Sequence, residues 1–357
     1  MNTTAGTKST HLAVGAKRSI VGRAEAQPQA AAGFQSILAC IDGSSQAGSV
    51  LVWANMLARR LHASLRTLCV LDTSAKSAAP HDPIAWEMRR IEARNRVGHL
   101  LENASADEGG TVGIEVAIGP FDDCFQAVLE HSAVDLCLIG AVGEDARPGR
   151  VIGDTARRII EAAPCSVLIV PPGAMLDSGQ AVAAIRRLMV PLDCSRRAEV
   201  ALPPAVALAD AFGAELVVAH ALPEPAITEI GPPDEAGIAL RRNIAQHNRK
   251  TAERYMSRLR ARLALDRRAI RSLIVNGDDP RHRLARAAVE EGADLIVLAA
   301  KGAGGYADQS LGSVADFLVT HMRKPLLVVR SARGQSAPAR AARPGATGLD
   351  KSGHGWA

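Results

Sequence analysis

Two glycine loops carry the residue spacing that most clearly predicts chemistry. They share the pattern Gly-x2-Gly-x9-Gly, with alanine for the first glycine of the second loop: Gly140, Gly143 and Gly153, then Ala299, Gly302 and Gly312. Glycine permits a positive φ and lets backbone N–H groups approach an anion closely. Asp154 follows the first pattern and Ser313 the second, where we expect helices to begin. Because free N–H groups at a helix start favour phosphate, each loop predicts an anion site.

A carboxylate follows an apolar run in two other places. Asp42 comes after residues 36–41, and Asp193 comes after residues 187–192. At the end of a strand, a carboxylate can accept hydrogen bonds from the hydroxyls of a sugar or from a base. Asp is also a common helix N-cap, and residues with helical periodicity follow both positions. For Asp42 we leave both interpretations open, and for Asp193 we favour ligand contact.

These residues belong to an internal repeat that defines the fold. Each copy begins with an apolar strand, an amphipathic helix, a second strand and a long charged helix, at 36–41, 45–62, 65–71 and 84–106, then at 187–192, 196–212, 215–222 and 235–264. A third strand and a helix follow, then an apolar strand after Asp135 or Asp294, a helix, and a last strand at 166–170 or 326–330. Strands that alternate with helices predict an α/β fold with parallel pairing. We therefore expect two doubly wound, flavodoxin-like or Rossmann-like domains, each a five-stranded parallel sheet flanked by helices.

Length and charge set the domain boundaries. The chain has 357 residues, enough for two domains. We place them at 34–173 and 186–330, joined by a linker at 174–185. The tails 1–33 and 331–357 are rich in Ala, Gly, Ser, Thr and Pro, and we expect them to be disordered. Each tail has a net charge of +3, so the remaining residues carry −1 of the chain's net +5, and no basic face for specific nucleic-acid binding is predicted on the domains.

Several classes of protein do not fit the sequence. No apolar run has the roughly 20 residues of a membrane-spanning helix, and the first 33 residues lack the apolar segment of a secretory signal. The six cysteines are scattered and the histidines lack metal-ligand spacing, which predicts free thiols in a cytoplasmic protein. No Walker lysine loop, nucleophile elbow or other catalytic constellation occurs, so we expect binding rather than catalysis.

The duplicated pattern resembles the universal stress protein family in its tandem form. The resemblance covers about 34–330 and rests on the two glycine loops, the Asp after each first strand, the helix that follows it, and the fourth and fifth strands. It implies a protein of the stress response that binds ATP or AMP, with Mg²⁺ left open. The implied contacts with adenine and ribose are Asp42 and Val70 in the first copy, and Asp193 and Ala221 in the second. The implied contacts with phosphate are Gly140, Gly143 and Gly153, then Gly302, Gly312, Ser313 and the Val314 N–H.

The two copies differ in how well they suit a phosphate. The first has Asp154 where the second has Ser313. A carboxylate about 4 Å from a phosphate charge costs roughly 4 kcal/mol at an effective dielectric of about 20. A missing serine hydrogen bond costs about 1 kcal/mol. We therefore predict that the second copy is the better nucleotide site, and that Asp154 serves as a helix N-cap.

Two other functions remain open from the sequence. The first is a nucleotide-free scaffold that binds an unidentified protein partner, and the second is a slow ATP hydrolase. Residues 167–170 and 326–330 could pair within one chain, as in an intramolecular pseudo-dimer, and a homodimer of whole chains also stays open. Pairing of this kind would close two sheet edges that otherwise invite aggregation.

Overall fold

The computed structural model describes nine segments of the chain. They are residues 33–72, 82–104, 112–143, 151–174, 185–225, 234–263, 269–277, 279–304 and 309–330. Apart from Gly33, the two tails predicted to be disordered lie outside these ranges, as does most of the linker predicted at 174–185. Those predictions therefore stay untested.

The first half of the described chain alternates strands and helices. Its elements are β1 (Ser36–Ile41), α1 (Ala47–Leu61), β2 (Ser64–Leu71), α2 (Pro83–Ala104), β3 (Gly113–Ile118), α3 (Phe121–His131), β4 (Leu136–Gly140), α4 (Asp154–Ala162) and β5 (Ser166–Val170). The central strands are apolar throughout because both of their faces are covered. In α1, Val50, Trp53 and Leu57 are buried at helical spacing, and the helix ends at His62, which adopts a left-handed φ of 54°.

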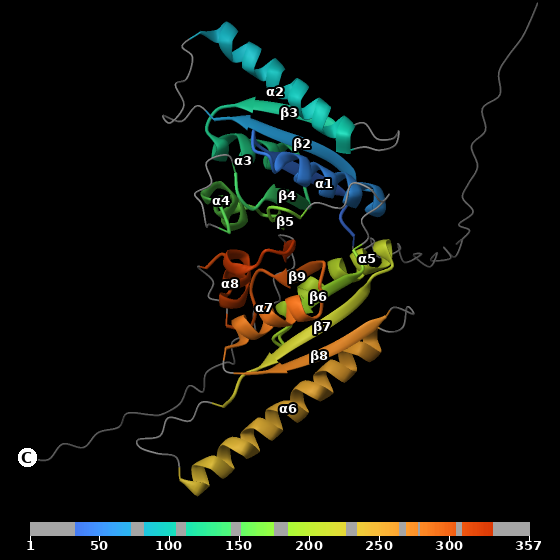
Figure 1. Cartoon of the computed structure of the whole chain (residues 1–357), viewed down its shortest axis with the longest axis vertical. Helices are drawn as coiled ribbons and strands as arrows, with labels where there is room; N and C mark the ends of the chain where they lie inside the picture. Colours follow the sequence, from blue (N-terminus) through green and yellow to red (C-terminus); the bar gives the residue numbers. More distant parts are fainter. Residues whose placement is uncertain are drawn as a thin grey trace, which may run out of the picture. The chain divides into compact units, whose positions relative to one another are not determined.

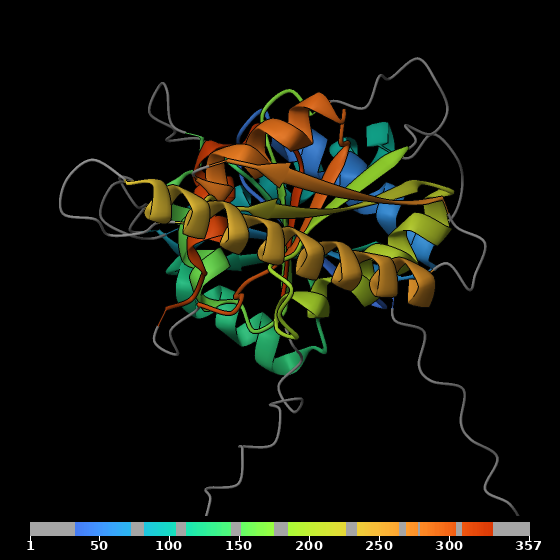
Figure 2. The same cartoon turned by 90° about the horizontal axis from the view of Figure 1, so that it is seen from below.

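The second half repeats this order. Its elements are β6 (Arg187–Pro191), η1 (Ala198–Ala201), α5 (Leu202–Phe212), β7 (Glu215–Leu222), α6 (Glu235–Leu263), β8 (Ile270–Asn276), α7 (Pro280–Glu290), β9 (Leu295–Ala299), α8 (Ser313–His321) and β10 (Leu326–Val329). The single helix predicted at 196–212 is present as the 3₁₀ turn η1 followed directly by α5. The long helix α6 runs alongside β8 (Figure 2). No helix in the described ranges has the length and apolar character needed to cross a bilayer.

The ten strands in the described residues form one sheet, in the order β3-β2-β1-β4-β5-β10-β9-β6-β7-β8 (Figure 1). The α/β class with parallel pairing is confirmed, and the sheets of the two halves are joined into one. They join where β5 and β10 pair antiparallel, with Leu327 opposite Leu168. The pairing of last strands predicted from the sequence is therefore present. It satisfies the backbone groups that two open edges would expose.

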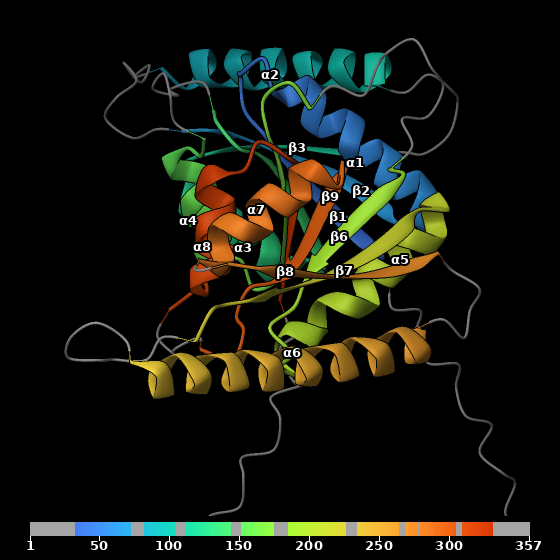
Figure 3. The same cartoon turned by 60° about the horizontal axis from the view of Figure 1, so that its bottom comes forward.

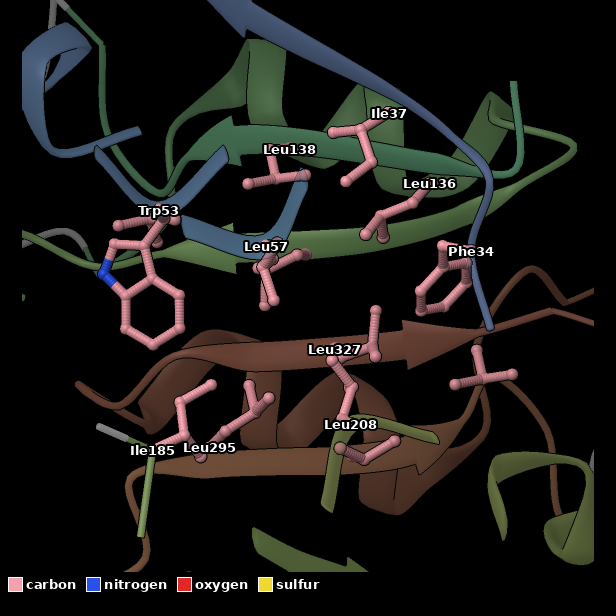
Figure 4. Packing of buried hydrophobic residues seen from close by; sticks show 14 of the residues in the cluster. Phe34, Ile37, Trp53, Leu57, Leu136, Leu138, Ile185, Leu208, Leu295 and Leu327 are labelled. Atoms are coloured by element: carbon pink, nitrogen blue, oxygen red, sulfur yellow. The ribbon is translucent and has the colours of Figure 1, made fainter. Parts of the chain in front are cut away.

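Each face of the sheet has its own apolar core, and each core contains residues of both halves. One face packs against α1, α2, η1, α5 and α6, and the other packs against α3, α4, α7 and α8. Figure 3 shows α6 and α7 on opposite faces of β7 and β8. On the first face, Trp53 and Leu57 of α1 lie in the same cluster as Leu327 of β10 (Figure 4). The two halves thus share cores as well as a sheet.

Candidate functional site

The glycine loops and the two aspartates lie at the same edge of the sheet. Asp42 follows β1, and its neighbour β4 leads into the first loop. Asp193 follows β6, and its neighbour β9 leads into the second loop. Parallel strands present their carboxyl ends at one edge, which is where doubly wound sheets bind ligands. The topology therefore brings each aspartate to its own glycine loop.

The two loops have the same backbone frame. In the second loop, the Ala300 N–H donates to the Val329 carbonyl at 2.9 Å, and the Gly312 N–H donates to the Ala300 carbonyl at 2.8 Å. In the first loop, the Ala141 N–H donates to Val170 at 2.8 Å, and the Gly153 N–H donates to Ala141 at 2.7 Å. In each half, the hydrogen bond from the N-cap glycine therefore connects the start of the helix, α4 or α8, to the residue that follows the preceding strand, β4 or β9.

The loop positions are occupied by glycine because neighbouring atoms leave little room for a side chain, and not because the backbone there needs a positive φ. None of the five loop glycines has a positive φ, so our expectation of positive-φ turns is wrong. A Cβ on Gly143 would lie 2.7 Å from Oδ2 of Asp42, and one on Gly302 would overlap the Asp193 carboxylate. The aspartate and the second glycine therefore form one unit in both copies.

The second loop offers backbone donors that nothing in the described chain uses. A Cβ on Gly312 would lie 3.6 Å from the Gly302 N atom, so the start of α8 lies next to that amide. The N–H groups of Gly302, Ser313 and Val314 make no hydrogen bond within the described residues. Two of them are the first N–H groups of α8, where the helix dipole adds positive potential. Together they form a small cradle of donors.

Asp193 links the end of β6 to this cradle. Its Oδ1 accepts from the Ser195 N–H at 3.0 Å, and its Oδ2 accepts from the Ala303 N–H at 2.6 Å. Burial opposes ionisation of Asp193, but hydrogen bonds from Ser195 and Ala303 outweigh it and hold the pKa of this carboxyl below its ordinary value. In the first copy, Asp42 accepts from the N–H and the hydroxyl of Ser44.

Neither aspartate is a helix N-cap. The N-cap of α1 is Gln46 and that of η1 is Arg197, so the capping alternative is wrong for Asp42 and for Asp193. Our expectation for Asp154 is also wrong. Gly153 and Gly312 are the N-caps, and Asp154 and Ser313 are the first residues of α4 and α8. A carboxylate there still interacts favourably with the helix dipole.

The residues implied for adenine lie level with the aspartates. The β1–β2 register pairs Ile41 with Cys69, which places Val70 beside Asp42 along the edge. The β6–β7 register pairs Pro191 with Ala219, which places Ala221 beside Asp193. Val70 is half-buried, and Ala221 is 8% exposed. Both can present an apolar surface to a base.

His220 and Cys194 lie next to this position. The His220 Nδ1 is 2.8 Å from the Leu192 carbonyl, and the Cys194 Sγ is 3.6 Å from the same ring nitrogen. The histidine thus has a partner at the end of β6. Burial and the neighbouring Asp193 and Glu199 raise the pKa of the Cys194 thiol to about 11.

Sequence reasoning missed two contributors to these sites. Gln46 lies against Gly140, because a Cβ on this glycine would be 3.3 Å from the Gln46 Oε1. Gly140 therefore makes room for a side chain of its own domain. Ala303 contributes through its backbone N–H, for which the residue type carries no signal. Within the described ranges, no group of three or more His, Cys, Asp or Glu side chains could hold a metal ion.

The fold and these loops define a class: a tandem α/β protein with a glycine-loop site at the carboxyl edge of each half-sheet. The model of the universal stress protein family matches the chain twice, over residues 33–171 and 184–330. The chain belongs to the universal stress protein family.

Relatives and solved structures agree with this membership. A universal stress protein of Mycobacterium tuberculosis is 27% identical over 198 residues, which cover 55% of this chain and 61% of that relative. One of Mycobacterium bovis is 24% identical over 307 residues, which cover 81% of this chain and 95% of that relative. The crystal structure of a universal stress protein from Archaeoglobus fulgidus aligns with 83% of this chain and 98% of that chain, at a TM-score of 0.58 and 17% identity. At 17% identity, the similarity to the Archaeoglobus fulgidus structure shows a shared fold.

Proposed function

We propose that this protein binds an adenine nucleotide, ATP or AMP, and acts in the stress response by binding rather than by catalysis. The observation that carries the proposal is the cradle of Gly302, Ser313 and Val314 N–H groups at the start of α8. Three neighbouring amides without a partner in the described residues, two of them at the start of a helix, suit a phosphate group. The family membership supports the same chemistry.

The nucleoside would extend from this cradle toward Asp193 and Ala221. The Asp193 carboxylate accepts from the N–H and the hydroxyl of Ser195 and from the Ala303 N–H. Oδ2, which accepts the Ala303 N–H, has a second lone pair that a ribose hydroxyl can use. The negative charge of Asp193 disfavours a phosphate beside it, which orients the ligand with its sugar at β6 and its phosphates at α8. Mg²⁺ would then have to be bound chiefly by the nucleotide itself.

The first copy is proposed as the weaker site. Gly143 and Gly153 repeat the frame of the second loop, but Asp154 brings a carboxylate into the first turn of α4. Glu144 and Asp145, which would add to this repulsion, lie outside the described residues. A nucleotide phosphate at α4 would therefore meet negative charge, whereas the same group at α8 would meet the Ser313 hydroxyl.

The nucleotide-free scaffold remains the second candidate function. The observation in its favour is that the Ala303 and Gly312 N–H groups are already bonded within the protein. Mass spectrometry of gently purified protein separates the two functions. The proposal expects a co-purifying adenine nucleotide or, failing that, saturable binding of added nucleotide, and the scaffold expects neither.

Calorimetric titration with ATP and AMP tests the site itself. A methyl group on Gly302 would overlap the Asp193 carboxylate, so Gly302→Ala should move the loop and weaken binding. Gly304→Ala is the matched control in the same loop, because nothing lies within 4 Å of the added Cβ. Equal affinities of the two variants would contradict the proposed site.

A further inference from the structure

A hollow lies at the edge of the sheet opposite the glycine loops, at the amino ends of the strands. It has a volume of about 650 Å³, and it is lined by the amino ends of β1 and β2 and by the α3–β4 connection, including Gln35, Arg66, His131, Ser132, Val134 and Asp135. Doubly wound sheets do not ordinarily bind their ligand at this edge. Any site here is separate from the proposed nucleotide site.

Arg66 projects from β2 into the lining of this hollow, and its side chain is half-buried. Its Nη1 donates to the Ser132 hydroxyl at 2.6 Å. Its stem crosses the start of β3, where a Cβ on Gly113 would lie 3.3 Å from the Arg66 Cγ. Within the described residues, no carboxylate lies within ion-pair distance of its guanidinium.

The second half of the chain shows what such an arginine binds. The pair Arg66–Gly113 in the β2–β3 register corresponds to the pair Val217–Arg271 in the β7–β8 register, so the arginine has moved to the neighbouring strand. Arg271 is held by two carboxylates. Its Nε donates to Glu215 at 3.1 Å, and its Nη1 and Nη2 donate to Glu291.

Serines replace both carboxylates in the first half. Ser64 faces Ser36 in the register that pairs Glu215 with Arg187, so Ser64 holds the position of Glu215. Ser132 is the C-cap of α3, as Glu291 is the C-cap of α7. The first half thus keeps an arginine and lacks the two carboxylates that neutralise its counterpart.

We propose that this hollow binds a small carboxylate, whose oxygens occupy the place that Glu215 and Glu291 take around Arg271. The guanidinium of Arg66 presents a planar fork of donors that matches a carboxylate in this way. The Ser132 hydroxyl, which already accepts from Arg66, can donate its proton to the ligand.

The other ionisable groups at the hollow already have hydrogen-bond partners. Both oxygens of Asp135 accept backbone N–H groups, from Gln35 at 2.7 Å and from Ser36 at 3.0 Å. The carbonyl end of α3 carries negative potential, and His131 in its last turn lies 2.7 Å from the Ala127 carbonyl. The Arg66 guanidinium donates to a neutral hydroxyl, and within the described residues no carboxylate lies at ion-pair distance from it.

Thermal unfolding of the full chain tests the proposal, with sodium propionate as the probe and sodium chloride holding the ionic strength constant. A ligand that binds only the folded state raises the unfolding midpoint in a saturable way. We expect this rise in the wild type and its loss in Arg66→Gln. Lys250→Gln, which removes an exposed charge from α6, is the control and should keep the rise.

The substitution Ser132→Glu provides a second arm that does not depend on removing the arginine. It restores the carboxylate that Glu291 supplies in the second half. We expect it to raise the midpoint without propionate and to abolish the response to propionate. An equal response in the wild type and in either hollow variant would overturn the proposal, as would a response to inorganic phosphate but not to propionate.

Discussion

The Oδ2 of Asp193 accepts a hydrogen bond from the Ala303 N–H at 2.6 Å. This bond joins the end of β6 to the loop after β9, across the edge where the proposed nucleotide would sit. Gly302 lies against the Asp193 carboxylate, so any side chain at that position would displace it. The aspartate thus shapes the loop as well as offering acceptors to a ligand.

Removal of this carboxylate should weaken the second site more than the first. Hydrogen bonds to charged groups contribute about 1.5–3 kcal/mol each, so loss of one corresponds to about tenfold or more in affinity. We expect Asp193→Ala to lower ATP affinity by at least about that factor and Asp42→Ala to have a smaller effect, as measured by calorimetry. If Asp42→Ala abolished binding while Asp193→Ala left it unchanged, our ranking of the two copies would be reversed.

The ion network at the amino edge of the second half should make stability depend on pH. Hydrogen bonds from Arg271 lower the pKa of Glu291, and those from Arg187 and Arg271 outweigh burial and lower the pKa of Glu215, both from an ordinary value of 4.5. Folded-state pKa values below the unfolded value mean that this stability is present above about pH 4.5 and is lost as the pH falls through the folded values.

Urea unfolding of the wild type and of Arg271→Gln checks this pH dependence. The wild type should be the more stable at neutral pH, and the gap should shrink as the pH falls below about 4.5, when the carboxylates bind protons. A gap that stays constant across this range would show that the network contributes nothing through charge.

The shared cores should make the two halves unfold together. Leu327 of β10 is 1% exposed and lies in the same cluster as Trp53 and Leu57 of the first half. We expect Leu327→Ala to lower the free energy of unfolding by about 2–5 kcal/mol. Leu240→Ala, at a residue 52% exposed, is the control and should change it by less than about 0.5 kcal/mol.

Differential scanning calorimetry reads both the size of this loss and its cooperativity. A single transition, shifted as a whole by Leu327→Ala, is the expected result. Two resolved transitions, of which only one moves, would mean that the joined sheet does not couple the halves.

The buried thiols should resist alkylation in the folded protein. Burial is the largest cause that raises the pKa of Cys165, to about 12, and the fully buried Cys137 lies 3.6 Å from the Cys40 sulfur. The thiolate is the reactive form, so these residues should react only after unfolding. Iodoacetamide labelling at pH 8 with mass spectrometry should find modification confined to the half-buried Cys124 and Cys194, and slow there because the pKa of both thiols is raised. Fast modification of Cys137 would contradict the packing.

Much of the fold followed from the repeat in the sequence. The strands predicted at 36–41, 166–170 and 215–222 match β1, β5 and β7 in their bounds, because apolar runs bounded by turn residues are distinctive. The joining of the two sheets depends on the antiparallel pairing of β5 with β10, which are far apart in the sequence. The sequence permitted that pairing but could not require it.

The site was less predictable in its detail. The positions of Asp42, Asp193 and the loop glycines at one edge follow from parallel topology, which the sequence indicated. The reason for Gly143 and Gly302 did not follow, because it is a contact with an aspartate more than a hundred residues away. The Ala303 N–H and the Gln46 contact with Gly140 had no signature in residue type.

The most direct test of the central claim is a two-dimensional amide NMR titration of the protein with ATP. We predict saturable shifts of the Gly302, Ser313 and Val314 amide signals, which appear before any shift at Gly143. The Ala221 signal should move at the same ligand concentrations. If these three amides stay unchanged while ATP is present in large excess, the glycine loop of the second half does not hold a phosphate, and the protein is a scaffold.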